Sequence, residues 1–348
     1  MEVLEGNEEL LALQEAGIRY VSCNDKGICR VAEGKVFRYV DKSGNPVTNE
    51  RILQRIQALV LPPAWTDVWI CSNANGHLQA TGIDVRGRKQ YRYHPKWVAL
   101  RSEKKFFDLY AFGMRLPVLL QKVQQDLRKR TFSKEKVCAL AVSVMQRTSF
   151  RVGNKHYEQT NGSYGLTTLK NKHLQKLSAS KVFFKFIGKK GVVQEAYFRE
   201  KTLIKMLLKV KDLPGQRIFQ YYDEHGNVQA LESGDINDYL KQSLGLSASC
   251  KNFRTWNGCL LALKHMAEKE IPSSITARKK SILETIDYVA ATLGNTRSVT
   301  RSHYVHPRIL NDYEVGKLDN WIKRTQRKSA PVLEKYFERK LLAILKMV

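Results

Sequence analysis

The chain has few cysteines, and their spacing lacks the pattern of a zinc site. Its six cysteines stand at positions 23, 29, 71, 138, 250 and 259. None forms a C-x-x-C pair, and no cluster of histidines lies near them in the sequence. Because zinc sites are built from closely spaced cysteine and histidine ligands, we expect no bound metal. Thiols used in this way are typical of a reducing compartment, in which most of them are buried and inert.

Long apolar runs are also missing, and so is a basic N-terminal segment followed by an apolar one. No stretch is long enough to cross a bilayer as a helix. These absences predict a cytoplasmic protein without membrane contact, associated with the nucleoid if the host is a bacterium. The sequence also lacks internal repeats and low-complexity segments.

Acidic residues are scarce, because 33 Asp and Glu stand against 59 Lys and Arg, which gives a net charge of +26. The acids are scattered, so the sequence lacks the dense carboxylate cluster with which many nucleases bind metal ions. The basic residues are spread over all 348 positions, and 43% of the residues are hydrophobic. We therefore expect a folded basic surface with nucleic acid as its partner, on a chain long enough for two domains.

The residue pattern predicts an α+β fold with two domains, residues 1–98 and 99–348. The first is expected to be rich in strands, with a short helix at its start and a second one between strands. Turn residues separate these segments. The expected strands lie at 19–22, 35–40 and 68–71, and the expected helices at 8–14 and 51–59.

The second domain reads as mainly helical, with a β-hairpin island. Two strands, at 181–187 and 192–198, flank the glycine-bounded turn 188–191. Asn311 and Glu314 have the spacing of a capping box and predict another helix after them. The remaining helices are expected at 104–130, 134–148, 202–210, 235–244, 251–269, 273–293 and 331–346.

Tyr304 ends the basic segment 294–304, where a phenol flanked by arginines is poorly explained as core filling. Cleavage of a phosphodiester by an enzyme nucleophile needs an attacking oxygen, donors for the non-bridging oxygens and an acid for the leaving oxygen. Arg151, Lys189, Arg254 and Asn295 precede the tyrosine and supply such groups. Each of them alone also has a structural explanation, such as a surface arginine, a turn lysine or a packed tyrosine. The ordered set carries the inference.

Several blocks in this order resemble the type IB DNA topoisomerases, in particular the small poxvirus-like and bacterial branch. The resemblance runs over nearly the whole chain. It is carried by GRKQYRY at 87–93, by LKNKH at 169–173 and by the segments around Arg151, Lys189, Arg254 and Tyr304. Independent blocks in one order are far more specific than a single motif.

The resemblance implies a role for each of these residues. Tyr304 would attack a DNA phosphorus and hold the strand as a 3′-phosphotyrosine. Arg151 and Arg254 would bind the non-bridging oxygens, since a guanidinium stays charged and can bind bidentately. Lys189 would protonate the leaving 5′ oxygen, with Arg151 as a second donor. Lys190 is the alternative to Lys189, which we prefer because it directly follows the glycine of the family's GK pair.

Asn295 departs from the family pattern, because poxvirus-type and eukaryotic members carry histidine at this place. An amide can still donate a hydrogen bond to a phosphate oxygen, but it does not titrate. We therefore expect cleavage to depend only weakly on pH near 6–7, where an imidazole titrates.

The same resemblance makes the N-terminal part a cap that closes over DNA, with a hinge at 97–105. Alternation places Tyr91 and Tyr93 on one face of an extended strand. On its residues alone, this segment is a β-hairpin with a basic outer face. The implied DNA-contacting residues are Arg86, Arg88, Lys89, Gln90, Tyr91 and Tyr93, together with Lys170 of the catalytic part.

The implied activity is the relaxation of supercoiled double-stranded DNA by a monomer that acts as a clamp. One strand is cut, rotates and is resealed, without ATP, metal or a small-molecule cofactor. A tyrosine site-specific recombinase is the first alternative, but recombinases carry histidine where this chain has Lys251, and their N-terminal domain is helical. A non-catalytic basic nucleic-acid-binding protein is the second. It explains the charge but not the ordered Arg–Lys–Arg–Asn–Tyr set.

Overall fold

The computed structural model describes residues 7–34, 36–327 and 329–346. The chain divides into two compact units, residues 1–105 and 106–348. The division falls inside helix α3 (Pro95–Leu127), at residue 105 and not at the expected residue 98. The expected hinge at 97–105 is thus helical. Its Trp97 packs with Leu13 and Ile18 in a small core of the N-terminal unit.

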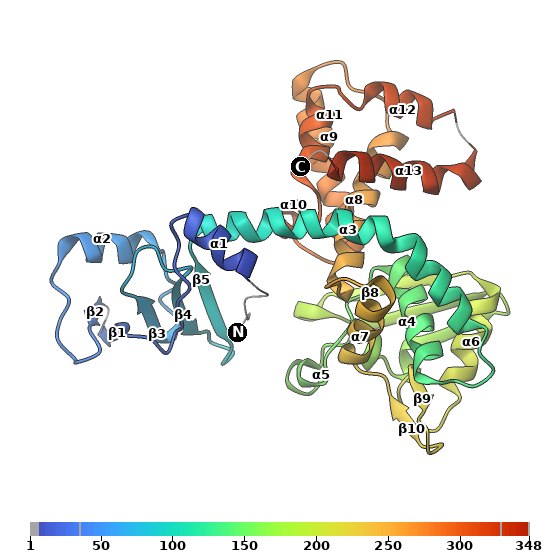
Figure 1. The fold of residues 1–348 in the computed structure, drawn as a ribbon, viewed down its shortest axis with the longest axis horizontal. Helices are drawn as coiled ribbons and strands as arrows, with labels where there is room; N and C mark the ends of the chain where they lie inside the picture. The colour runs from blue at the N-terminus through green and yellow to red at the C-terminus, as the bar shows by residue number, and fades with distance from the viewer. Residues whose placement is uncertain (1–6, 35, 328, 347–348) are drawn as a thin grey trace. The chain divides into compact units, whose positions relative to one another are not determined.

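The N-terminal unit is built on a five-stranded antiparallel sheet with the strand order β2-β1-β3-β4-β5. Helix α2 packs on the sheet (Figure 1), and its Ile56 belongs to the same buried hydrophobic cluster as Ile28, Ile70 and Ala80. Asn49 caps this helix by accepting two backbone hydrogen bonds. The elements are α1 (Asn7–Glu15), β1 (Gly27–Glu33), β2 (Val36–Val40), α2 (Glu50–Ala58), β3 (Thr66–Cys71), β4 (Leu78–Ile83) and β5 (Lys89–Tyr93).

The second unit is mainly helical, so the predicted α+β class is confirmed. Its two sheets have the orders β6-β7-β8 and β10-β9. The helices are α4 (Lys134–Thr148), α5 (Lys155–Asn161), α6 (Lys201–Lys211), α7 (Ser233–Leu244), α8 (Cys250–Glu268), α9 (Ile275–Leu293), α10 (Arg297–His303), α11 (Pro307–Glu314), α12 (Asp319–Thr325) and α13 (Ala330–Leu345). The strands are β6 (Leu174–Ser178), β7 (Lys181–Ile187), β8 (Val193–Phe198), β9 (Gln220–Tyr222) and β10 (Val228–Ala230).

Helix α4 lies in the centre of this unit, because every residue from Val137 to Met145 is buried. Helix α3 packs closely on α8. A Cβ added at Gly113 would lie 2.3 Å from the ring of Trp256, so this position leaves no room for a side chain. The residues that follow α4, α8 and α9 are thereby held on a single rigid core.

Two expectations about local structure were wrong. Residues 19–22 form no strand, and only Arg19 makes a single bridge, to Gly76. Asn311 and Glu314 lie inside α11 and do not cap a later helix. That helix begins earlier because the side chain of His306 caps it and Pro307 takes its first position, where a missing N–H costs nothing.

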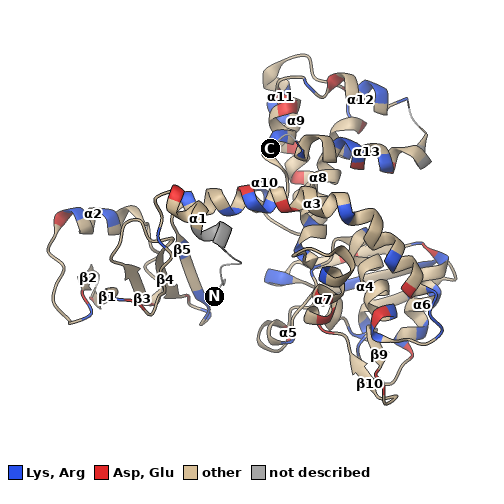
Figure 2. Cartoon of the chain, viewed as in Figure 1, with Lys and Arg blue, Asp and Glu red and all other residues tan. Residues whose placement is uncertain are grey.

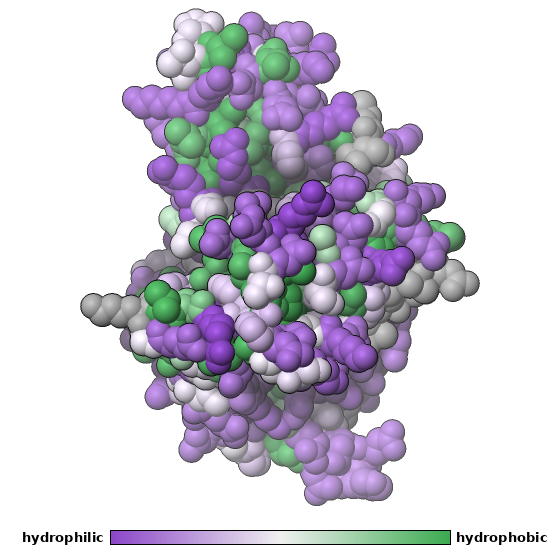
Figure 3. Space-filling model, turned by 90° about the vertical axis from the view of Figure 1, so that its left-hand side faces the viewer, coloured by the Kyte–Doolittle hydropathy of each residue, from purple (hydrophilic) through white to green (hydrophobic). Residues whose placement is uncertain are grey.

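Lysine and arginine are distributed over both units, as Figure 2 shows. On the face drawn in Figure 3, hydrophilic residues predominate and apolar ones form scattered patches. None of the helices in the described part of the chain combines the length and apolarity that crossing a membrane requires.

Candidate active site

Arg254 is the buried centre of the site, with 4% of its surface exposed. It lies in the second turn of α8 and ties two helix ends together. Its Nη1 donates to the carbonyl of Ser149, and its Nη2 donates to the carbonyl of Leu293 at 2.8 Å. Burial lowers the pKa of this guanidinium, which nevertheless stays charged at neutral pH. The end of α4 and the end of α9 are therefore positioned by one cation.

Arg151 follows α4 after a sharp change of chain direction. Ser149 ends the helix in the left-handed region, with φ of 57°. Phe150 is buried against β7, 4.8 Å from the ring of Phe186. Arg151 is then fixed through its own carbonyl, which accepts from the N–H of Leu166 at 2.8 Å. Burial, and next the charge of Arg254, lower the pKa of Arg151 to about 10.

Asn295 follows the glycine that ends α9, where φ is 61°. The Nη2 of Arg151 donates to its Oδ1 at 2.5 Å. This bond orients the amide, so its nitrogen faces away from the arginine. The Nδ2 atom is buried and has no hydrogen-bond partner in the described part of the chain.

Tyr304 directly follows α10 and is half-buried. Its backbone rests on α8. A Cβ added at Gly258 would lie 2.5 Å from its carbonyl oxygen, and the thiol of Cys259 contacts the same oxygen at 3.5 Å. Its ring centroid is 5.2 Å from Cζ of Arg254. The phenol is thus held beside the buried guanidinium.

Two buried N–H donors in this cluster lack a partner among the described residues, Nε of Arg254 and Nδ2 of Asn295. Leaving a buried donor unsatisfied costs about 1–3 kcal/mol, so such groups are rare in folded proteins. Arg254 lies beside the ring of Tyr304, and Asn295 is joined to the cluster by its bond from Arg151. An anion with several oxygens, such as a phosphodiester, would satisfy them.

Lys189 lies on the tight turn between β7 and β8. Gly188 begins the turn by donating to the carbonyl of Val192 at 2.8 Å, and Lys190 adopts the left-handed region, with φ of 64°. Lys189 is exposed, but protein groups around it displace part of its water. This partial loss of water, and next the charge of Arg151, lower its pKa below that of a free lysine. The structure thus brings Lys189 within electrostatic reach of the cluster.

Comparisons with known proteins identify the family. A model of the catalytic core of eukaryotic DNA topoisomerase I matches residues 94–329, and a model of the N-terminal domain of bacterial DNA topoisomerase IB matches residues 36–84. The chain belongs to the type IB DNA topoisomerases. Its membership decides against the recombinase and against the non-catalytic binding protein.

Viral relatives place this type IB topoisomerase with the poxvirus-like and bacterial kind. It is 31% identical to DNA topoisomerase 1B of Acanthamoeba polyphaga mimivirus, over 83% of this chain and 88% of the viral one. It is 29% identical to DNA topoisomerase 1B of vaccinia virus (strain Copenhagen), over 76% of this chain and 83% of the viral one.

The implied DNA-contacting residues of this topoisomerase lie around β5, apart from Lys170. Tyr91 and Tyr93 share one face of the strand, with parallel rings 6.0 Å apart. They line a pocket of about 210 Å³ with Lys89, whose Nζ donates to Cys23 Sγ at 3.1 Å. Arg86 is exposed on the β4–β5 turn. Arg88 and Gln90 both contact Asp84.

Lys170 is held by protein groups, because its Nζ lies 3.2 Å from Oε1 of Glu158. The LKNKH block around it has a structural reason. His173 is buried, and its Nδ1 accepts from the backbone N–H of Lys170 at 3.0 Å. Burial lowers the pKa of this histidine, so it remains a neutral acceptor at physiological pH. Lys170 is therefore only partly available to a phosphate.

Sequence reasoning missed three features of the site. Two of them are the carbonyls of Ser149 and Leu293 that anchor Arg254, which are backbone groups and cannot be recognised from the residue types. Lys251 served only to argue against a recombinase, yet its charge contributes to the lowered pKa of Lys189. Its place one helical turn before Arg254 was the available signal. Among the described residues, no group of three or more His, Cys, Asp or Glu side chains is placed to hold a metal ion.

Proposed function

We propose that Tyr304 of this type IB topoisomerase cuts one strand of duplex DNA by reversible transesterification. Its phenolic oxygen attacks the phosphorus, and the bond from phosphorus to the 5′ oxygen breaks. A 3′-phosphotyrosine remains, with a free 5′-hydroxyl. The free strand rotates about the intact one, and the hydroxyl then attacks the phosphotyrosine and releases the phenol. Because the covalent link conserves the energy of the phosphodiester, the reaction requires neither ATP nor a metal.

The observation that carries the proposal is a pair of buried donors without partners among the described residues: Arg254 Nε, on the guanidinium beside the ring of Tyr304, and Asn295 Nδ2, on the amide held by Arg151. In this mechanism they donate to the non-bridging oxygens as negative charge develops on the phosphorane. Arg151 adds a second guanidinium and fixes the amide of Asn295. Relaxation of a supercoiled plasmid in EDTA and without ATP tests the overall activity. Failure of relaxation under these conditions would contradict it.

Lys189 is proposed to be the general acid, and its loss should be repaired by a better leaving group. Lys189→Ala is expected to slow single-turnover cleavage roughly 10²–10⁴-fold. A substrate with sulfur in place of the bridging 5′ oxygen should restore the rate, because a thiolate leaves without protonation. Equal slowing on both substrates would remove Lys189 from this role. Lys190→Ala is the matched control on the same turn and should cleave both substrates at the wild-type rate.

The charge state of Lys189 sets the expected alkaline limit of cleavage. The acid acts only when protonated, so the rate should fall as the pH rises through its pKa. Its pKa lies below that of a free lysine because of burial and the charge of Arg151.

With asparagine at position 295, we expect the rate of cleavage to change little between pH 6 and 7. Its amide donates in one protonation state only, whereas an imidazole titrates near about 6.5. Asn295→His should introduce an inflection, and the charge of Arg151 should push it to lower pH because a like charge disfavours the imidazolium. The measurement is the rate of single-turnover cleavage against pH for both proteins. A steep wild-type inflection between pH 6 and 7, unchanged in the variant, would contradict the assignment.

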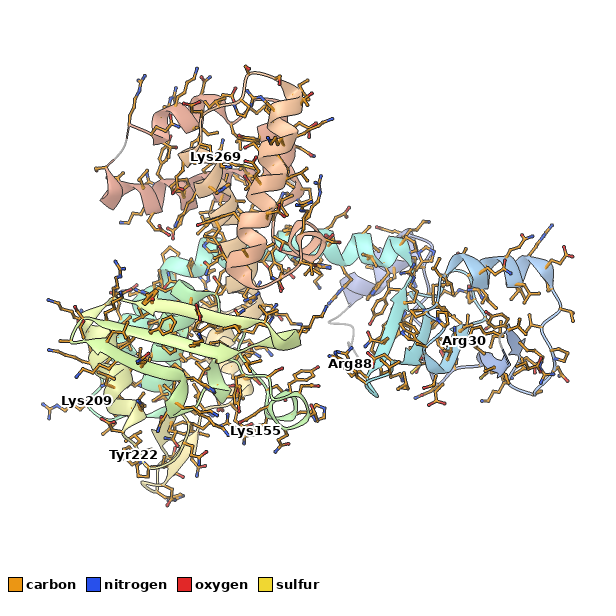
Figure 4. All side chains as sticks on the ribbon, turned by 180° about the vertical axis from the view of Figure 1, so that it is seen from behind. Arg30, Arg88, Lys155, Lys209, Tyr222 and Lys269 are labelled. Atoms are coloured by element: carbon orange, nitrogen blue, oxygen red, sulfur yellow. The ribbon has the colours of Figure 1, made fainter. Side chains whose placement is uncertain are left out.

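We further propose that the N-terminal unit closes over double-stranded DNA as a clamp, and that a monomer suffices. Exposed basic and aromatic residues on β5 and the preceding turn support a DNA contact there. Helix α5 follows Arg151 and carries two exposed residues, Tyr157 and Lys155, the second of which is labelled in Figure 4. This helix offers a second contact with DNA. Double-stranded DNA as the substrate also supports a cytoplasmic location, at the nucleoid in a bacterial host.

A further inference from the structure

Three turns of this protein have the same construction. Comparing them shows which hydrogen bonds of the aspartate form the turn and which are found in one turn alone. They span 41–45, 84–88 and 223–227, and each has the sequence Asp-x-x-Gly-x. In each, the glycine N–H donates to the aspartate carbonyl, and the aspartate N–H donates to the carbonyl of the fifth residue. The aspartate Oδ1 accepts two further backbone N–H groups. This oxygen therefore forms the turn in all three cases.

The second carboxylate oxygen distinguishes Asp84 from the other two. Oδ2 of Asp41 accepts from Nδ2 of Asn45 at 3.2 Å, and Oδ2 of Asp223 accepts from Nε2 of Gln229 at 3.1 Å. Each of these partners is a neutral amide. Asp84 Oδ2 accepts three bonds, two of them from a guanidinium. They come from Nε of Arg88 at 2.9 Å, Nη2 of Arg88 at 2.6 Å and Nε2 of Gln90 at 2.9 Å.

Arg88 and Gln90 are two of the side chains proposed to contact DNA, and the contact with Asp84 has a different consequence for each. The guanidinium is bound through two nitrogens to an anion, so its charge is offset before DNA arrives. The amide of Gln90 is oriented, since its nitrogen faces Asp84 and its carbonyl oxygen is left as an acceptor. Figure 4 labels Arg88 in the N-terminal unit.

We propose that Asp84 is a positioning residue for site selection, which fixes the Gln90 amide for a base edge and masks the charge of Arg88 against indiscriminate phosphate binding. An oriented carbonyl accepts from the exocyclic amino group of adenine or cytosine in the major groove. A masked arginine contributes less to the sequence-independent, salt-sensitive part of the affinity. The inference rests on the proposed DNA contact of β5.

The charge on Asp84 is present throughout the pH range of interest. The hydrogen bonds from Arg88 lower the pKa of this carboxyl to about 2. The carboxylate therefore stays ionised above that pH, and its partners are held equally well at pH 6 and at pH 9.

The substitution Asp84→Asn tests the role of Oδ2 separately from the role of Oδ1. Its amide oxygen can still accept from the backbone N–H groups of Arg86 and Arg88, so the turn is kept. Its amide nitrogen then faces the donors of Arg88 and Gln90 and cannot accept from them. We expect the affinity for random-sequence duplex DNA to rise roughly threefold and its salt slope to steepen by about 0.9, the effect of one added phosphate contact. The preference among cleavage sites on a long labelled duplex should weaken at the same time.

Asp41→Asn is the matched control, because it removes the same charge from a turn of the same construction in the same unit. It should change neither the salt slope nor the cleavage pattern. If Asp84→Asn matches this control in both measurements, or lowers affinity together with melting temperature, the positioning role is overturned. Gln90→Ala tests the underlying proposal separately. An unchanged cleavage pattern in Gln90→Ala means that the β5 base contact itself fails, whereas a changed pattern there with none in Asp84→Asn overturns only the role of Asp84.

Discussion

Tyr304→Phe is expected to bind duplex DNA with the affinity of the wild type, to form no covalent adduct and to relax no supercoils. Loss of the attacking oxygen should lower cleavage by about 10⁵-fold or more. The fold should be retained, because the ring still packs beside Arg254 and the backbone still rests on Gly258. The measurements are plasmid relaxation and gel-shift titration on the same preparation.

Tyr288→Phe provides the control for this substitution. Its side chain is 44% exposed on α9, and its ring stacks on His265 at 4.5 Å. Removing that hydroxyl should leave relaxation at the wild-type rate. Substantial relaxation by Tyr304→Phe would show that another group attacks the DNA.

Arg254→Lys is also expected to slow cleavage strongly. A lysine keeps one positive charge but loses the Nε donor and the fork that reaches both Ser149 and Leu293. Those two carbonyls belong to the segments that carry Arg151 and Asn295. The substitution should therefore remove a contact to the transition state and also disturb the alignment of Arg151 and Asn295. We expect single-turnover cleavage to fall roughly 10²–10³-fold. Arg254→Ala should also lower the free energy of unfolding by about 1–3 kcal/mol, since it leaves the buried carbonyls of Ser149 and Leu293 without a donor.

Arg278→Lys separates chemistry from stability. Arg278 is also a half-buried bridge, which bonds Asp319 at 2.6 Å and the carbonyl of Tyr313 at 3.0 Å. The change from arginine to lysine there should lower the melting temperature without slowing cleavage at a temperature where the protein is folded. Cleavage by Arg254→Lys within twofold of the wild type would contradict its catalytic role.

The sequence predicted best those elements whose pattern is local. Helix α4 and strand β7 have the expected bounds. Helix α4 contains a long, mainly apolar run that is buried from Lys136 to Met145, and burial alternates along β7. Strand β1 was missed because only Ile28 in it is buried, so its alternation is weak. The start of α3 was expected at residue 104, but the helix begins at Pro95, a favoured first helical residue.

The sequence was sufficient to propose which residues make up the candidate site, but their organisation could not be predicted. Motif order pointed to Tyr304 and its partners, since each side chain type has a chemical reason to be there. The anchoring of Arg254 depends on carbonyls 105 and 39 residues away. Every residue has such a group, so no sequence pattern marks the two that matter. The proposed role of Asn295 depends on its bond from Arg151, which occupies the amide oxygen and leaves the amide nitrogen to donate.

The identity of the covalent link tests the central claim most directly. A suicide substrate, whose short 5′-hydroxyl strand dissociates after cleavage, would trap the adduct on wild-type protein in EDTA. Proteolysis and mass spectrometry would then locate the DNA. We predict one adduct, with the 3′ phosphate of the cut strand joined to the peptide that contains Tyr304. An adduct on another residue, a link through a 5′ phosphate, or no adduct with active protein would contradict it.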